Sequence, residues 1–405
     1  MTRHQNSKGC GRVRARVFTL PVLVVILAIR TSAQTWEQTT APAFTYPCVA
    51  CTADGETVLT SGYRITIPIY LSTNRGATWI TSSAPVGTWS GIAASADGGK
   101  LVAVSYSPRQ IYTSTNSGIT WISNSVPPAG WTSVASSADG NQLVAVNNSP
   151  QTIYTSTNGG TVWVQSTAAP PAIWRSVALS ANGIKIAAAN NNPGTIYTST
   201  DGGVAWTHAS NAPTANWACI ASSADGQGLL AVASSASIYT QAGGGVYTSK
   251  DAGTTWTSNS VPGTNWSSCA LSADGKHLVV AANSGYIYDS MDSGVTWKSN
   301  SAPLLSWSGV SASADGRRLF AAATGGGVWR LEMNLGPELR ATASNAILLL
   351  AWVLPSMDFV LQQSADCSAT NWANSTNVPM LNLSNLQYEI TLPMSDRSFY
   401  RLKRQ

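Results

Sequence analysis

Carboxylates are the side chains that could give this chain hydrolytic chemistry, because cleavage of a glycosidic bond commonly uses a pair of Asp or Glu residues. Of the 13 Asp residues, six lie in recurring Ala-Asp-Gly turns, three in recurring octapeptides and three in the last 70 residues. Outside these sets the repeat region offers only four carboxylates: Glu37, Glu56, Asp289 and Glu332. They fall on predicted strands or turns at unrelated points of the repeat, so the sequence does not predict a facing pair.

Other reactive residues form no recognisable constellation. His208 and His277 are isolated in the sequence, and Cys48-Val-Ala-Cys51 has CxxC spacing without a second Cys or His pair nearby. We therefore expect no metal site and no cofactor, and interpret the cysteines as small packing residues. No Gly-x-Ser-x-Gly nucleophile and no phosphate-binding glycine loop is present.

A series of aromatic residues could bind a ligand instead. Each lies seven residues before the Ala of an Ala-Asp-Gly marker, at Tyr46, Trp89, Trp131, Trp174, Trp217, Trp266 and Trp307. One interpretation is an aromatic collar near one face, partly available to stack on sugar rings or to clamp a peptide. The alternative is that these side chains wedge between neighbouring sheets, as large apolar residues at repeated positions usually do.

These aromatics belong to a repeat of about 42 residues. An octapeptide recurs six times, ending at Trp79, Trp121, Trp163, Trp206, Trp256 and Trp297, and the Ala-Asp-Gly marker recurs seven times, once as Ala-Asn-Gly. Alternating segments between these turns predict four short strands per unit. Four strands in such a unit are typical of a β-propeller, here all-β with seven blades. The last unit lacks a fourth strand, which residues 35–40 can supply to close the ring.

The octapeptide resembles the Asp-box, Ser-x-Asp-x-Gly-x-Thr-Trp, of the BNR-repeat superfamily. Residues 249–256 and 290–297 match this pattern fully, whereas the first three copies carry Asn74, Asn116 and Asn158 at the Asp position. The resemblance implies a turn-stabilising role for the box and is shared by sialidases, other glycoside hydrolases, sortilin-type receptors and photosystem II assembly factors. The Arg triad, Arg-Ile-Pro motif and Tyr/Glu pair expected of a sialidase do not carry over to this chain.

The two ends of the chain differ from the repeat. Residues 1–33 read as a signal peptide, with a basic segment to Arg16, an apolar stretch from Val17 to Ile29 and small residues before Gln34. We expect a propeller over 34–334 and a small β-sandwich-like domain over 335–405. The formal charge of +5 arises in the signal: 6 of 23 basic residues lie there, leaving 17 against 18 acidic ones. The near-neutral remainder does not predict a nucleic-acid partner.

Together these features predict a secreted or periplasmic protein without stable membrane insertion after signal cleavage. The blades differ mainly in Ser, Thr, Asn, Ala and Pro, whereas an active site would break the repeat. We therefore expect a non-enzymatic binding or assembly module, whose loop face recognises a glycan or an extracellular or envelope protein. The alternative is a glycoside hydrolase of sialidase-like or related Asp-box type, which two carboxylates converging with an Arg in the channel would indicate.

Overall fold

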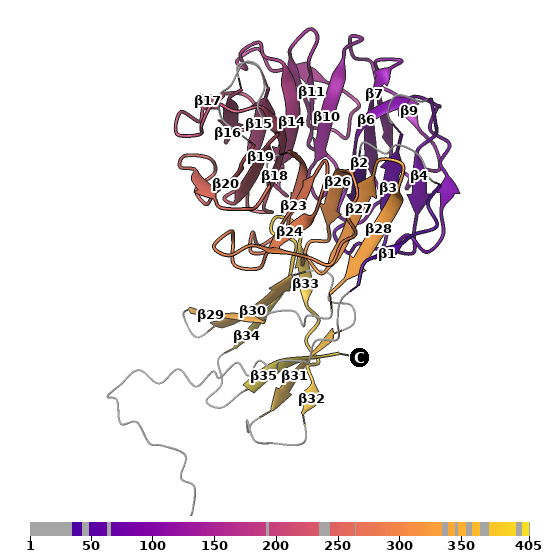
Figure 1. Ribbon diagram of the computed structural model, residues 1–405. Coiled ribbons are helices and arrows are strands. Elements are labelled where there is room, and N and C mark those ends of the chain that lie inside the picture. Colours follow the sequence, from indigo (N-terminus) through magenta and orange to yellow (C-terminus); the bar gives the residue numbers. More distant parts are fainter. Residues whose placement is uncertain are drawn as a thin grey trace, which may run out of the picture.

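A computed structural model of the chain contains β-strands and their connections, with no helix among the residues that it describes (Figure 1). These residues are 35–42, 48–62, 66–191, 194–234, 244–263, 265–333, 339–344, 347–353, 359–364, 372–393 and 399–404. The predicted signal peptide and Tyr46 lie outside these ranges. Within them, no helix has the length and apolarity needed to cross a membrane.

Residues 37–332 form seven antiparallel sheets of four strands, six of which follow chain order from the inner to the outer strand. The first three are β2 (Cys48–Cys51), β3 (Val58–Ser61), β4 (Tyr70–Ser72) and β5 (Ile80–Thr81); β6 (Thr88–Ala94), β7 (Leu101–Ser107), β8 (Ile111–Ser114) and β9 (Ile122–Ser123); and β10 (Trp131–Ser136), β11 (Leu143–Asn147), β12 (Ile153–Ser156) and β13 (Val164–Gln165). The next three are β14 (Trp174–Leu179), β15 (Ile186–Asn190), β16 (Ile196–Ser199) and β17 (Thr207–His208); β18 (Trp217–Ser222), β19 (Leu229–Ala233), β20 (Val246–Ser249) and β21 (Thr257–Asn259); and β22 (Trp266–Leu271), β23 (Leu278–Ala282), β24 (Ile287–Ser290) and β25 (Lys298–Ser299).

The seventh sheet joins the two ends of the repeat region. Its strands are β26 (Trp307–Ala312), β27 (Arg318–Ala323), β28 (Gly327–Glu332) and β1 (Glu37–Gln38). Strand β1 runs antiparallel to β28, with Glu37 opposite Arg330 and Gln38 opposite Trp329. The predicted pairing of the N-terminal segment with the last unit is therefore present, although β1 is shorter than the expected 35–40. The pairing covers the edge of β28 that would otherwise expose unpaired backbone groups.

A closed ring of backbone hydrogen bonds connects all seven sheets at the turns between their first and second strands. The N–H of the marker alanine in each turn donates to the carbonyl of its counterpart in the next sheet, at N···O distances of 2.6–3.0 Å. The alanines run in the order Ala53, Ala96, Ala138, Ala181, Ala224, Ala273 and Ala314, and Ala314 donates back to Ala53. A small residue suits this position because seven backbones meet around one axis.

The Trp residues that open the inner strands form the core between neighbouring sheets. Trp131 is fully buried and packs with Val104 and Ile111 of the preceding sheet. Its ring also meets the edge of Tyr154 in its own sheet, at 5.6 Å between centroids. Trp89, Trp174, Trp217, Trp266 and Trp307 are buried to the same degree. The wedge interpretation therefore describes the packing of the six Trp residues of this series.

The octapeptides form tight turns between the third and fourth strands. In the fifth copy, the Ser249 hydroxyl donates to Asp251 Oδ1 at 2.8 Å and accepts the N–H of Gly253 at 2.9 Å. Asp251 also accepts the N–H and hydroxyl of Thr255, at 2.8 and 2.6 Å. Trp256 then donates from Nε1 to the Gly253 carbonyl at 3.0 Å. Every side chain of the motif is used within its own turn, which supports the predicted structural role.

The last described strands form two smaller sheets below the main body in Figure 1. One contains β29 (Arg340–Ser344), β30 (Ile347–Val353), β34 (Gln387–Pro393) and β33 (Met380–Asn382), and the other β32 (Ala373–Asn374), β31 (Phe359–Ser364) and β35 (Phe399–Arg404). Leu350, Trp352 and Ile390 of the first sheet share a core with Leu361 and Tyr400 of the second. The two sheets therefore share one core; that they form a sandwich-like domain stays a prediction.

We predict that Trp174→Ala lowers the free energy of unfolding by about 3–5 kcal/mol, because it leaves a cavity between two sheets. The change can be measured by urea denaturation followed by circular dichroism. Val164→Ala serves as the control, since Val164 is 61% exposed on an outer strand and its loss should cost less than about 0.5 kcal/mol. Equal effects of the two substitutions would show that Trp174 is not part of the core.

Candidate functional site

The inner strands surround a cavity of about 350 Å³ on the axis of the seven sheets. Each of β2, β6, β10, β14, β18, β22 and β26 contributes residues to its wall. Most of the lining side chains are small, and Ser90, Thr132, Ser133, Ser176, Ser267, Ser268 and Ser308 give it a row of hydroxyl groups. A cavity of this size and polarity can admit a side chain or a small ligand.

These hydroxyls also connect neighbouring inner strands, which belong to different sheets. Ser90 donates to the Trp131 carbonyl at 2.7 Å, and Thr132 donates to the Trp174 carbonyl at 2.9 Å. Ser267 makes the same bond to the next strand. Side-chain hydroxyls thus supply bonds that a backbone ladder would supply within one sheet. The cavity wall is held in place by the groups that line it.

One mouth of the cavity carries the side chains that depart from this uniform lining. Tyr106 at the end of β7 is 41% exposed, and Asn148 follows β11 in the connection to β12. Arg175 is the second residue of β14 and is exposed. It is the only Arg, Lys, His, Asp or Glu among the described lining residues. No hydrogen bond or ion pair to another described residue occupies its guanidinium, so it can receive an anion.

The C-terminal strands lie at the opposite end of the axis. A second cavity of about 270 Å³ is lined by the Ala-Asp-Gly turns and by Leu386, which lies between β33 and β34. Arg340 pairs with Asp274 of one turn at 2.9 Å, and Arg317 lies over the Phe359 ring at 5.5 Å. The C-terminal strands therefore contact the end of the axis that carries the Ala-Asp-Gly turns, which we call the turn face. The opposite end, which we call the loop face, carries Arg175 and is the side available to a ligand.

The predicted aromatic collar is corrected by the burial of its residues. Trp89, Trp131, Trp174, Trp217, Trp266 and Trp307 are at most 1% exposed, so none presents a ring to solvent for stacking. Each indole packs in a core shared by its own sheet and the preceding one, which is the packing that a repeated large residue favours. Trp131 does line the axial cavity, but as part of its wall. Tyr46, the seventh member, lies outside the described residues.

Asp289 is buried beside His277 in the sheet β22–β25, next to the seam with the following sheet. It does not line the axial cavity. Its Oδ2 lies 3.8 Å from His277 Nε2, and Nδ1 of the same ring is 2.6 Å from the Gly316 carbonyl. Burial raises the pKa of Asp289 and lowers the pKa of His277 to about 4. A neutral imidazole and a carboxyl group enclosed in this way have no access to a substrate. The pair serves packing between two sheets.

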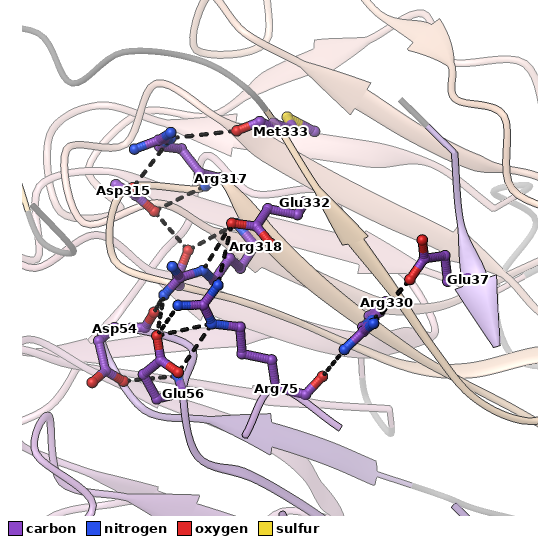
Figure 2. A network of polar contacts seen from close by, with 11 residues as sticks. Glu37, Asp54, Glu56, Arg75, Asp315, Arg317, Arg318, Arg330, Glu332 and Met333 are labelled. Carbon is purple, nitrogen blue, oxygen red and sulfur yellow. Dashed lines mark hydrogen bonds and ion pairs between the residues drawn. The ribbon is translucent and has the colours of Figure 1, made fainter. Parts of the chain in front are cut away.

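Glu56 and Glu332 converge on two Arg residues, but at the seam between the last and first sheets. Figure 2 shows the guanidinium groups of Arg75 and Arg318 between the two carboxylates. Arg75 donates three hydrogen bonds to Glu56 at 2.6–3.0 Å and lies 3.6 Å from Glu332. Arg318 lies 3.0 Å from Glu56 and 3.7 Å from Glu332, and also donates to the Asp54 carbonyl.

Glu37 belongs to the same seam, where it pairs with Arg330 at 2.9 Å. None of the three Glu residues lines the axial cavity among the described residues. The convergence that would indicate a hydrolase therefore occurs, but outside the channel. Its location, where two chain segments distant in sequence meet, assigns the network to closure of the ring.

The CxxC cysteines are enclosed in the inner wall. The Cys48 sulfur lies 3.2 Å from the Ser61 hydroxyl, and the Cys51 sulfur lies 3.2 Å from Ser311. Burial raises the pKa of Cys48 to about 11 and that of Cys51 to about 12. No group of three or more potential metal ligands occurs within the described ranges. Both thiols therefore remain protonated and pack as small side chains.

Blade-like four-stranded sheets around an axial cavity are the features of a β-propeller, and comparison with solved structures agrees. YCF48 from Cyanidioschyzon merolae aligns with a TM-score of 0.57 at 17% identity, over 73% of this chain and 98% of that one. Hydrazine synthase of Kuenenia stuttgartiensis aligns with a TM-score of 0.60 at 14% identity, over 74% and 98%. The fold is therefore that of a β-propeller.

The neighbours differ in what they do. A structure of YCF48 bound to D1 peptide aligns at 16% identity with a TM-score of 0.57, over 77% of this chain and the whole of that one. A GH74 xyloglucanase from Xanthomonas campestris aligns at 15% identity with a TM-score of 0.58, over 79% of this chain and 59% of its own length. No protein-family model and no curated protein matches the sequence.

Arg175, Tyr106 and Asn148 were missed by reasoning from the sequence, although one signal was available for Arg175. The residue after each aromatic of the series is Pro47, Ser90, Thr132, Arg175, Ala218, Ser267 or Ser308. Arg175 is the one charged residue at this repeated position. The strand period places it on the face opposite the buried Trp, which is the face that lines the axis.

The buried His277 gives a prediction about pH. Its unfolded pKa is near 6.5 and its folded pKa about 4, so the unfolded chain binds a proton first as pH falls. The stability that the neutral imidazole contributes to the folded protein is present above pH 6.5 and is lost as the pH falls toward 4. We expect the wild type to lose about 2 kcal/mol relative to His277→Gln between pH 7.5 and pH 5.

Urea unfolding of both proteins at pH 7.5, 6 and 5 would measure the difference. Gln is the matched substitution because Gln142 occupies the same position, directly before the second strand, in the sheet β10–β13. Asp274 and Lys298 act on the imidazole and Asp289 lies 3.8 Å from it, and all three residues remain in both proteins. A difference that does not change with pH, or that grows in favour of the wild type in acid, would contradict the assignment.

Proposed function

We propose that the chain is an exported binding or assembly module without enzymatic activity, which recognises a partner at the open mouth of its axial cavity. In this proposal residues 34–334 form a seven-bladed propeller closed by β1, and residues 335–405 form a small β domain on its turn face. Residues 1–33 act as the signal peptide that exports the chain to the periplasm or the exterior. The partner binds on the loop face, where the connections between sheets vary most in sequence.

The observation that carries this proposal is the composition of the axial cavity. It combines hydroxyl and amide groups with one unpaired cation, Arg175, and its described lining contains no carboxylate or imidazole. Such a lining can bind a polar segment, but it lacks the pair of acidic groups on which glycoside hydrolysis depends. An Arg guanidinium offers a planar set of donors that fits a carboxylate with two parallel hydrogen bonds.

A protein segment bearing a carboxylate is the partner that this chemistry favours. The propeller of YCF48 has been solved with a D1 peptide, which shows that the same fold can bind a peptide. The enclosed volume of about 350 Å³ fits one or two side chains and not a folded surface. We therefore infer that a loop or terminal segment of an extracellular or envelope protein inserts toward Arg175.

Recognition of a glycan is the second candidate, because Tyr106 provides an exposed ring at the mouth. A neighbour with this fold is a xyloglucanase. A glycoside hydrolase would have to use the network of Glu56 and Glu332, two described carboxylates that share the same Arg partners. Their contacts with Arg75 and Arg318 hold the last and first sheets together, which favours binding without cleavage.

We predict that an array of 12-residue peptides, with and without Asp or Glu, captures the purified protein on acidic peptides. Arg175→Thr should weaken this binding at least tenfold, because it removes the only charge among the described residues that line the cavity. Thr is the matched substitution since Thr132 fills the equivalent position. Binding should be measured by calorimetry on the best peptide, with the circular dichroism spectrum as a check on folding.

The control is Lys276→Ala, which removes an exposed cation from the turn face and should leave affinity unchanged. A glycan array, with released reducing sugar assayed on positive spots, tests the alternative functions in parallel. Sugar release that disappears in Glu56→Gln would establish a hydrolase. Glycan binding without release, lost in Tyr106→Ala, would replace the peptide by a sugar. Acidic peptides that bind Arg175→Thr as well as wild type would refute the proposed site.

A further inference from the structure

Two cysteines lie on neighbouring inner strands, at the seam between the sheet β18–β21 and the sheet β22–β25. Cys219 lies in β18 and Cys269 in β22, and both line the axial cavity. Both are free thiols in this structure. The proposed binding function uses neither of them, so a role for this pair of cysteines is independent of that function.

Cys219 occupies a position that serine fills in other sheets. Ser133, Ser176 and Ser268 each accept the backbone N–H of the next inner strand, at 3.1–3.3 Å. At the equivalent place in the next seam, the Cys219 thiol donates to the Cys269 carbonyl at 3.6 Å. The Cys269 thiol donates to the Leu230 carbonyl of the sheet β18–β21 at 3.5 Å, and its side chain interacts with that of Cys219. Each thiol therefore contacts the backbone of the other sheet across this seam, and the two side chains interact.

The two thiols differ in acidity. Interaction with the Cys269 side chain lowers the pKa of Cys219 to about 7, whereas burial raises the pKa of Cys269. Near neutral pH Cys219 is thus partly a thiolate, the form that attacks disulfides. Cys48 and Cys51, with pKa values of about 11 and 12, stay protonated in the same channel wall.

The same seam lacks a contact that other seams possess. The residue before the second strand reaches the turn of the next sheet: Lys100 donates to Asn141 at 2.7 Å, and Lys185 to the Asp225 carbonyl at 2.9 Å. At the corresponding position of the sheet β18–β21 stands Gly228, which has no side chain. A cleft of about 200 Å³ lies there, lined by Gly228, Asp225 and Asp274 among others.

We propose that Cys219 and Cys269 form a thiol–disulfide exchange site, which closes to a reversible disulfide across this seam when a disulfide-bearing oxidant reaches the axial cavity. The disulfide joins the inner strands of the two sheets and so replaces the polar contact that Gly228, without a side chain, cannot make at the turn. The oxidant is a small-molecule disulfide or the exposed disulfide of another protein. It approaches through the mouth at Tyr106 and Arg175.

The reaction balances in two steps. The Cys219 thiolate attacks one sulfur of the oxidant, which forms a mixed disulfide and releases the first thiolate of the oxidant. The Cys269 thiol then gives up its proton and attacks the Cys219 sulfur, which releases the second thiolate. The protein loses two electrons and two protons in total, and the oxidant gains them as two thiols.

The test exposes the purified full chain to oxidised glutathione at pH 7.5 and then blocks the remaining thiols after unfolding. Peptide mapping by mass spectrometry should find the peptides with Cys219 and Cys269 joined, with no glutathione retained. The melting temperature should rise by about 5 °C, because the bond closes a loop of 50 residues, and dithiothreitol should reverse the rise. In a short pulse with N-ethylmaleimide, Cys219 should react at least tenfold faster than Cys48 or Cys51.

The repeat supplies variants that preserve the fold. Cys219→Ser places a serine where Ser176 stands in the preceding sheet, and it should abolish both the cross-link and the glutathione adduct. Cys269→Val introduces the residue of Val177 and should trap a stable glutathione adduct on Cys219. An adduct that persists on Cys219 in the wild type, or two unmodified thiols in a folded protein, would refute the exchange site. A cross-link that leaves the melting temperature unchanged would refute its role at the seam.

Discussion

The structure depends on the ring of seven hydrogen bonds that runs through the alanines of the Ala-Asp-Gly turns. Because Ala314 donates back to Ala53, the last bond can form only when the final sheet meets the first. The ring therefore couples the ends of a region of nearly 300 residues and explains several features of the repeat. Alanine permits the close approach of seven backbones, the glycine adopts the positive φ of the turn, and the Asp fixes the turn by accepting hydrogen bonds from nearby N–H groups.

The same constraint decides the chemistry of the axis. Inner strands of neighbouring sheets approach each other without forming a ladder, so their backbone groups need other partners. Ser and Thr hydroxyls provide these partners, which accounts for the low charge and high hydroxyl content of the repeat. The result is an axial cavity with a polar, uncharged wall. Within such a wall, a single cation such as Arg175 becomes the strongest feature that a ligand can meet.

The sequence predicted the strands, the turns and the closing pair because these follow from local patterns repeated about every 42 residues. It also indicated the position of each Trp in its strand, but not whether neighbouring sheets would cover the ring. Contacts between sheets escaped prediction for the same reason. Cys219 with Cys269, and Glu56 with Glu332, come together only because the sheets close into a ring. The repeat period predicts how far along the axis a residue lies, but it does not predict which residue of another sheet it contacts. Arg175 could have been found, since it alone breaks its repeated position with a charge.

Departures from the repeat are therefore the informative residues, and they fall into two kinds. The network of Arg75, Arg318, Glu56 and Glu332 lies where the repeat ends, and ring closure explains it. Its exposed pairs contribute little individually, whereas the buried Arg318 requires its acceptors, since an unpaired buried charge is costly. Arg175 and the pair of Cys219 and Cys269 lie within the repeat and not at its ends. The equivalent positions of other sheets carry uncharged residues, often serine. Ring closure does not require them, so their placement on the axial cavity points to the function of the protein.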